Sequence, residues 1–234
     1  LVDVGHRRAL DLSVWVPEQP LGPIATHEQW AEVYDRLVAL TMEHESTIVF
    51  VNTRRLVERI AHALEERLGA GCVAAHHGSM ARRTRLEAEE KLKAGEVPVV
   101  VATASLELGI DVGAVDLVCH LGAPRALATL IQRVGRSGHA RGAVPKGILF
   151  PLTPDDLVQA AASVRAVRDG ELDRLVIPVG PRDILAQQCV AIVATGELGV
   201  EELFALVRRA WPYRALARET FDEVLDMLAE GVAT

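Results

Sequence analysis

The feature that most constrains the fold is an alternation, over the first 155 residues, of short apolar runs with longer amphipathic segments. Many of the runs are rich in β-branched residues, and the segments between them repeat apolar residues at helical spacing. Strands separated by helices pair in parallel, so the sequence predicts an α/β fold with a mainly parallel sheet and helices on both faces. The expected strands are residues 8–18, 47–52, 71–78, 97–105, 114–122 and 146–152. The expected helices among them include 28–44, 81–95 and 53–69, the last capped by Thr53 and closed by Gly69.

Polar residues come directly after three of the expected strands, at 52–55, 76–79 and 103–105. Parallel sheets bind ligands at the carboxyl ends of their strands, so we expect these three segments to line one edge of the sheet. Ser79 also stands close to the start of the expected helix 81–95. A helix N-terminus with a hydroxyl beside it favours an anion, which makes this turn a candidate phosphate site.

The chain changes character near residue 178, where Pro178, Gly180 and Pro181 interrupt it. Beyond this point the patterns are helical only, with three amphipathic segments joined by short turns. The sequence therefore predicts two domains, 1–177 and 178–234. The second fits a helix-turn-helix or winged-helix unit without its β-wing, and a plain helical bundle fits the same pattern.

The basic residues are distributed unevenly. The net charge of −7 argues mildly against a chain that is permanently bound to nucleic acid. Between Asp116 and Asp155, however, there is no acidic residue. The same interval contains Arg125, Arg133, Arg136, Arg141 and Lys146. This segment predicts a focused anion site, although chance spacing along a helix and a loop would produce the same pattern.

Within that segment, residues 132–139 read QRVGRSGH. A helix is expected from Pro124, which suits a first turn, to about Gly135, with Arg136 emerging at its end between glycines. A guanidinium matches phosphate oxygens with a planar fork. We call Arg136 a candidate arginine finger, an arginine that supplies positive charge to a transferring γ-phosphoryl group. Upstream, Asp111 suits a ribose hydroxyl or an arginine, or else caps its own turn.

Metal and disulfide chemistry are not predicted. No carboxylate stands at ligand spacing from His76 and His77, and the three cysteines form no ligand pair. The cysteines are expected to be buried small hydrophobes in a reducing compartment. Without a signal peptide or a membrane-length apolar run, the expected location is the cytoplasm and no membrane partner is expected. Because the chain begins with Leu1 inside a strand-like pattern, we expect it to be an excised piece.

The motifs follow one another in an informative order. TIVFVNTRRLVERIAHAL, HHGS, VVVATASLELGIDV and QRVGRSGH resemble the motif series of the second RecA-like domain of superfamily 2 helicases. Within that superfamily the wording is most similar to the large helicase-related (Lhr) family, as in LIQRVGRSGHARGAVPKGILFPLT and ELFALVRRAWPYRAL. The resemblance covers nearly the whole chain, and it implies a RecA-like sheet domain followed by the start of a winged helix.

The resemblance also implies residue roles. Arg136 corresponds to the arginine finger, and Gln132 and Arg133 to the same nucleotide-facing motif. For Arg133 two roles stay open, a contact to the nucleotide or orientation of the motif without touching it. Gly109 and Asp111 match the motif that touches the nucleotide sugar and couples the two sites. The residues that match contacts to a single nucleic-acid strand (DNA, or DNA in a hybrid with RNA) are Thr53, Arg54, Arg55, Gly78, Ser79 and Thr103. His139 stands where the superfamily usually has a second arginine, so stabilisation of the γ-phosphate rests mainly on Arg136.

The chain lacks the other half of an ATP site. None of its lysines (Lys91, Lys93 and Lys146) follows a glycine or precedes Ser or Thr, so a phosphate loop is absent. The acidic sequence DEVL at 222–225 lies in an amphipathic helical pattern and is interpreted as a solvated face. ATP with Mg²⁺ would thus be held by an N-terminal RecA-like domain of the same polypeptide, and the chain alone is expected to be inactive and to bind no cofactor tightly. The alternative is a non-catalytic RecA-like docking module with a helical interaction tail.

Overall fold

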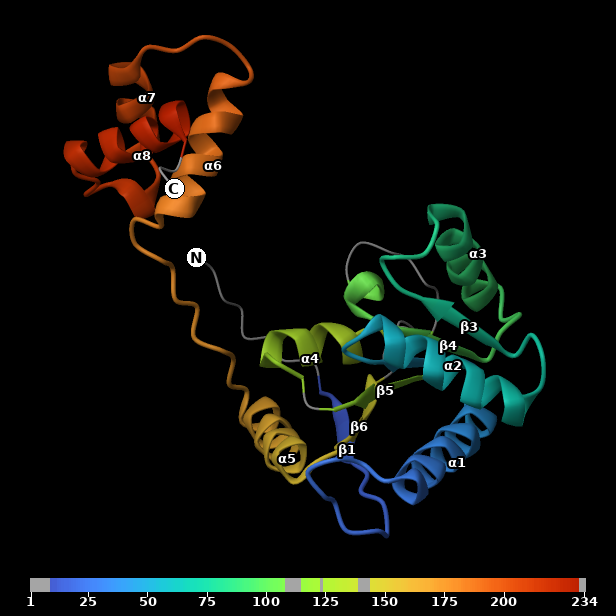
Figure 1. The fold of residues 1–234 in the computed structure, drawn as a ribbon. Coiled ribbons are helices and arrows are strands. Elements are labelled where there is room, and N and C mark those ends of the chain that lie inside the picture. The colour runs from blue at the N-terminus through green and yellow to red at the C-terminus, as the bar shows by residue number, and fades with distance from the viewer. Residues whose placement is uncertain (1–8, 108–114, 123, 139–143, 232–234) are drawn as a thin grey trace. The chain divides into compact units, whose positions relative to one another are not determined.

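The computed structural model describes residues 9–107, 115–122, 124–138 and 144–231 (Figure 1). The chain divides into two compact units, residues 1–173 and 174–234. We call them the sheet domain and the helical unit. The boundary predicted from the sequence lay after residue 177.

In the described part of the sheet domain, six strands form one sheet, and all of them pair in parallel. Their order across the sheet is β1-β6-β5-β2-β4-β3. The strands are β1 (Asp11–Val14), β2 (Thr47–Phe50), β3 (Val73–His76), β4 (Val99–Ala102), β5 (Leu117–Leu121) and β6 (Lys146–Phe150). The predicted parallel α/β fold is confirmed, and each expected strand is present in a shorter form.

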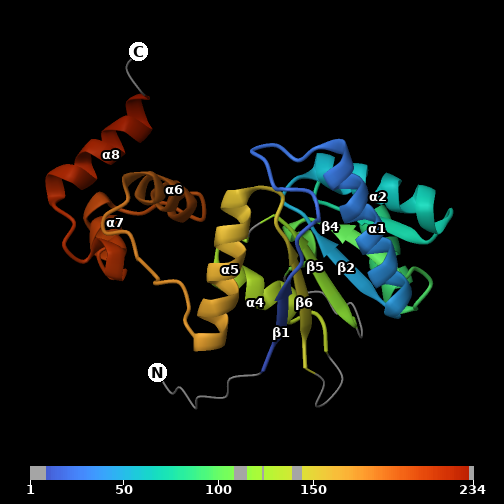
Figure 2. The ribbon, with the colours of Figure 1, turned by 90° about the horizontal axis from the view of Figure 1, so that it is seen from below.

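Both faces of the sheet are buried, as the apolar character of the strands predicted. Along β2, Val49 packs on one face, whereas Ile48 and Phe50 pack on the other, since successive side chains of a strand alternate. Helices α1 (His27–Glu43) and α2 (Arg54–Leu68) cover the first face. The opposite face is covered by α3 (Arg82–Lys93), α4 (Leu127–Val134) and α5 (Pro154–Asp169). Figure 2 shows α1 and α2 on one side of the sheet and α4 and α5 on the other.

Local side-chain caps fix the start of some helices, such as α2, but not the start of α4. Thr53 caps α2 by accepting a hydrogen bond from the Leu56 N–H at 3.3 Å, and Gly69 ends that helix, as predicted. The prediction that α4 starts at Pro124 was wrong, because this helix starts at Leu127 and its N-cap Ala126 has no capping side chain. Its second N–H, from Ala128, is instead accepted by the carboxylate of Asp173 at 3.1 Å. A cap that lies 45 residues away in the sequence leaves no local signal.

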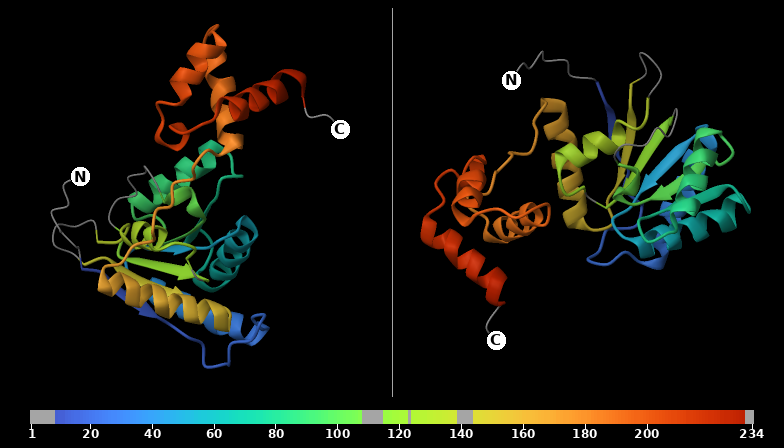
Figure 3. Two further views of the ribbon diagram at one scale, coloured as in Figure 1. Left: turned by 90° about the vertical axis from the view of Figure 1, so that its left-hand side faces the viewer. Right: turned by 90° about the horizontal axis from the view of Figure 1, so that it is seen from above.

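The helical unit has its own apolar core. Its described residues form α6 (Arg182–Val193), α7 (Val200–Val207), a short 3₁₀ turn at Trp211–Tyr213 and α8 (Arg218–Glu230), seen in orange to red in Figure 3. Phe221 is fully buried and its ring lies 5.0 Å from that of Phe204. The acidic sequence 222–225 lies on α8, where Asp222 pairs with Arg218 and Glu223 with Arg182, as expected of a solvated helix face.

Candidate functional site

The three polar segments predicted to share an edge follow the neighbouring strands β2, β4 and β3, and therefore lie at the same edge of the sheet. Two of the candidate strand-contact residues meet there. The guanidinium of Arg54, at the start of α2, donates to the Ser79 hydroxyl at 3.2 Å. Of the six candidate strand-contact residues, Thr103 is half-buried. The exposed ones are Thr53, Arg54, Arg55, Gly78 and Ser79. The edge thus presents basic and hydroxyl groups to solvent.

The turn that contains Ser79 is held from α2. The ring of His77 is buried, and its Nε2 lies 2.7 Å from a carboxylate oxygen of Glu58, while its Nδ1 accepts from the Ser79 N–H at 3.3 Å. Ser79 was expected close to the start of the next helix, and α3 does start at Arg82, with Ala81 as its N-cap and no side-chain cap. The hydroxyl of Ser79 is therefore oriented by Arg54, and it does not cap a helix.

Thr103 belongs to a chain of hydrogen bonds that crosses from β4 to α3. Its hydroxyl lies 3.3 Å from that of Ser105, which lies 2.7 Å from Nδ1 of His76. Nε2 of the same ring donates to Glu89 at 2.7 Å. Burial lowers the pKa of His76, because its ring is 1% exposed and the charged form loses hydration. A neutral ring that donates to Glu89 leaves Nδ1 as an acceptor for the Ser105 hydroxyl.

A second cluster surrounds Arg133 on α4. Its side chain is 7% exposed and its Nε donates to the carboxylate of Glu107 at 2.6 Å; Nη2 donates to the same oxygen. Nη1 donates to Nε2 of His120, and the guanidinium carbon lies 5.0 Å from the centre of the Phe50 ring. All parts of this guanidinium are turned towards groups of the sheet domain.

The protonation of His120 is fixed by its surroundings. Nδ1 lies 2.8 Å from the carbonyl oxygen of Gly122, which only accepts, so Nδ1 carries the proton and Nε2 is free to accept from Arg133. Burial, followed by the neighbouring charge of Arg133, lowers the pKa of His120 to about 4. The ring is therefore neutral at neutral pH, as its bond to a cation requires.

The loop that carries Arg136 is anchored at the amino ends of β5 and β6. Ser137 is fully buried, its hydroxyl oxygen accepts from the Lys146 N–H at 2.8 Å, and Gly138 donates to the Val115 carbonyl at 2.9 Å. Arg136 is half-buried, and its Nη2 donates to the backbone carbonyl of Glu107. Gln132 is exposed on α4. Gly109, Asp111 and His139 lie outside the described residues.

The basic residues of the acid-free segment do not act as one group in the described structure. Arg133 is buried against Glu107 and His120, whereas Nζ of Lys146 lies 3.0 Å from Nε2 of His44. Arg125 is exposed, and Arg141 lies outside the described residues. Arg133 and Lys146 are thus engaged elsewhere in the fold, and an anion site at Arg136 stays a prediction.

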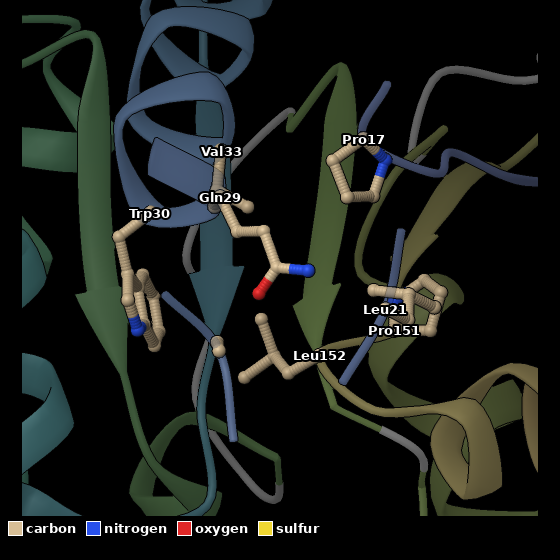
Figure 4. Close-up of a pocket in the computed structure, with 8 residues that line it drawn as sticks. Pro17, Leu21, Gln29, Trp30, Val33, Pro151 and Leu152 are labelled. Carbon is tan, nitrogen blue, oxygen red and sulfur yellow. The ribbon is translucent and has the colours of Figure 1, made fainter. Parts of the chain in front are cut away.

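Figure 4 shows a pocket between the start of α1 and the segments that follow β1 and β6, in which apolar side chains predominate. It is lined by Pro17, Leu21, Ala25, Gln29, Trp30, Val33, Pro151 and Leu152. The Gln29 amide donates to the Pro20 carbonyl at 2.5 Å and accepts from the Thr26 N–H at 2.7 Å. Its polar atoms thus serve the start of α1, and we interpret the pocket as packing between loop and helix.

Among the described residues, no group of three or more His, Cys, Asp or Glu side chains is arranged to hold a metal ion. No helix in the same part of the chain combines the length and apolarity that a membrane span requires. Cys119 and Cys189 are buried as expected, while Cys72 is half-buried.

Comparison with known proteins agrees with this geometry. Residues 30–141 match the helicase conserved C-terminal domain, and residues 165–234 match the winged helix domain of the large helicase-related protein. The chain is 38% identical over 232 residues to the ATP-dependent helicase Lhr-Core of Methanocaldococcus jannaschii, covering 99% of this chain and 28% of that protein. An Lhr helicase/uracil glycosylase of Escherichia coli is 39% identical over 86% of this chain and 15% of its own length.

Solved structures give the same result. The structure of Mycobacterium smegmatis helicase Lhr bound to ssDNA and AMP-PNP superposes with a TM-score of 0.85 at 41% identity, over 94% of this chain and 29% of that one. The helicase MrfA bound to DNA and AMPPNP superposes with a TM-score of 0.55 at 26% identity, over 66% of this chain and 22% of that one.

The parallel sheet and its matches define the C-terminal RecA-like domain of a helicase, followed by a winged-helix domain. The chain belongs to the large helicase-related (Lhr) family of superfamily 2 helicases. It spans less than a third of the length of the relatives described above. The predicted family and fold are confirmed.

Sequence reasoning missed two residues of the Arg133 cluster. Glu107 stands in the motif SLELGID, and no pattern in the sequence assigned it a role. His120 lies within the apolar run 114–122, where a lone histidine was unremarkable. The available signal was the burial predicted for that run, since an ionisable residue inside it needs a polar partner.

Proposed function

We propose that this chain is the second motor domain of an ATP-dependent nucleic-acid helicase or translocase. In this proposal Arg136 is the arginine finger, and Gln132, Gly109 and Asp111 complete the nucleotide-facing surface. ATP and Mg²⁺ are held mainly by an N-terminal RecA-like domain of the same polypeptide, because the chain has no phosphate loop. The chain alone is then inactive and binds nucleotide weakly. The observation that carries the proposal is the placement of Arg136, which is fixed by a buried anchor rather than carried on an unsupported loop.

The second part of the proposal concerns a single strand of DNA, alone or in a hybrid with RNA. The nucleic-acid backbone is contacted at the carboxyl edge of β2, β4 and β3. The residues that contact it are Thr53, Arg54, Arg55, Gly78, Ser79 and Thr103. The exposure of Arg54 and its hydrogen bond to Ser79 support this, because they place a cation and a hydroxyl side by side. A relative of 41% identity was solved bound to ssDNA and AMP-PNP, which also supports it.

Gly78 offers a further argument. It has no positive backbone φ, and a Cβ added there would meet no protein atom within 4 Å. The fold therefore does not require glycine at this position, whereas a phosphate that approaches the backbone closely would. Gly78→Ala is thus expected to leave the stability unchanged and to weaken binding to the strand.

The finger is tested in the protein that has both motor domains. Arg136→Ala should lower the rate of ATP hydrolysis about a thousandfold or more, roughly 4 kcal/mol of barrier, with little change in ATP binding. Arg125→Ala is the matched control, since it removes an exposed guanidinium of the same basic segment and should leave hydrolysis near the wild-type rate. Turnover retained by Arg136→Ala would eliminate the finger assignment.

The strand contacts are tested by the salt dependence of binding to oligo(dT). Arg54→Ala should weaken binding and reduce the slope of log K against log salt by about 0.7, as expected for one lost phosphate contact on a single strand. Arg165→Ala removes an exposed guanidinium from α5 and should leave the slope unchanged. If Arg54→Ala and Gly78→Ala both leave the slope and affinity unchanged, this edge does not bind the strand, and the alternative of a docking module without catalysis gains support.

A further inference from the structure

We propose that Glu107 and Arg133 are positioning residues, which together hold the arginine finger Arg136 in place without touching the nucleotide. This inference rests on the proposed role of Arg136 and deepens it. It assigns Glu107, which the motif resemblance leaves without a role. It also gives Arg133 a function different from that of a nucleotide ligand.

The first step is that the ion pair between Glu107 and Arg133 is internal. The two side chains are 14% and 7% exposed, and two nitrogens of the guanidinium share one carboxylate oxygen. The remaining terminal nitrogen donates to His120, whose neutral ring can only accept there. The face of the guanidinium lies over Phe50. Arg133 is therefore bound along both edges and on one face by groups of its own domain.

The second step is that the same two residues hold Arg136. The backbone N–H of Arg136 donates to the carbonyl of Arg133 at 3.0 Å. Its guanidinium nitrogen Nη2 donates to the carbonyl of Glu107. The two residues of the ion pair thus supply two of the carbonyl groups that bind Arg136, one through its main chain and one through its side chain. A shift of either partner moves the finger.

The third step concerns what a direct nucleotide contact by Arg133 would require. Its guanidinium would have to leave Glu107 and His120, and a buried carboxylate without its partner is strongly unfavourable. Arg136 is only half-buried, and holding it needs no such loss. In this proposal Arg136 contacts the phosphate, while Arg133 and Glu107 hold Arg136 in position and do not touch the nucleotide.

The test is a kinetic cycle in the protein with both motor domains. Glu107→Gln and Arg133→Lys should each lower kcat for ATP hydrolysis about 10- to 100-fold, with KM for ATP within about twofold of wild type, because a displaced group loses transition-state contact. In an Arg136→Lys background, which keeps a charge but not the fork, Glu107→Gln should lower kcat less than threefold further. Glu32→Gln, which changes a carboxylate on α1 that binds the Glu18 N–H, should leave kcat unchanged.

Each result separates the two proposals. If Arg136→Ala keeps its turnover, the finger and this inference both fail. If Arg136→Ala is inactive while Glu107→Gln and Arg133→Lys turn over normally, only the positioning role is overturned. An increase in KM for ATP with unchanged kcat, or an equal loss of kcat in the Arg136→Lys background, also overturns it, because these indicate direct nucleotide binding or general damage. Urea unfolding shows whether Glu107→Gln or Arg133→Lys destabilises the fold. The kinetics of the variant whose unfolding midpoint stays near that of the wild type decide the outcome.

Discussion

The buried histidine beside Arg133 predicts how the stability of the sheet domain responds to acid. His120 lies in β5, with Nδ1 donating to Gly122 and Nε2 accepting from Arg133. Protonation of Nε2 would remove the acceptor and place a second positive charge beside the guanidinium. The perturbation we consider is His120→Gln, which keeps a carbonyl oxygen for Arg133 but cannot titrate.

The magnitude follows from the pKa of His120 in the two states. Burial and Arg133 lower it to about 4 in the folded chain, whereas an unfolded histidine titrates near 6.5. A depressed pKa leaves stability unaffected above pH 6.5 and reduces it as the pH falls towards 4, because the unfolded state binds the proton first. The difference between these two pKa values corresponds to about 3 kcal/mol of folding free energy. About 2 kcal/mol of that stability is lost between pH 7 and pH 5.

The assay is urea unfolding at pH 7 and pH 5, followed by tryptophan fluorescence. Trp15 and Trp30 lie in the sheet domain, so a Trp211→Phe background confines the signal to it. In that background, His120→Gln should cost stability at pH 7 but reduce the loss between the two pH values by about 2 kcal/mol. His76 also has a lowered pKa, but it is present in both proteins and cancels in the comparison.

The control is His62→Gln. The side chain of His62 is 75% exposed and faces Glu66 on the surface of α2. Its removal should change the pH dependence by less than about 0.5 kcal/mol. If His120→Gln loses as much stability as the parent between pH 7 and pH 5, His120 is not kept neutral by its environment, and the account of how Arg133 is held would be wrong.

Three further outcomes are expected from the packing. Gly147→Ala should lower the stability of the sheet domain by about 1–3 kcal/mol in urea unfolding, because the new Cβ would lie 2.6 Å from a methyl group of Val134. Thr53→Ala should cost about 1 kcal/mol in the same measurement, since the α2 cap is lost, while Thr53→Ser should restore most of it. In the native chain, a thiol reagent should modify Cys72 well before Cys119, whose full burial raises the pKa of its thiol and blocks access; equal rates by mass spectrometry would contradict this burial.

Part of this protein was determined by its sequence alone. Apolar strands and amphipathic helices repeat in local patterns, and a strand that follows a helix pairs in parallel, so the α/β fold followed from periodicity. The order of the motifs around TIVFVN, HHGS and QRVGRSGH was equally visible along the chain, and it led to the helicase family that the comparisons confirm. The helix caps at Thr53 and Gly69 were readable because both ends of their hydrogen bonds lie within a few residues.

The tertiary structure decided what joins distant segments. Arg133, Glu107 and His120 come from three elements, and only the fold brings a cation, a carboxylate and a neutral ring into one buried cluster. The start of α4 depended in the same way on Asp173. Spacing along the chain reports which groups are available, but partners are chosen by burial, because a charge removed from water must bind whatever lies opposite. For that reason the sequence could only place Arg133 in a nucleotide-facing motif, whereas the structure shows its guanidinium buried against Glu107 and His120.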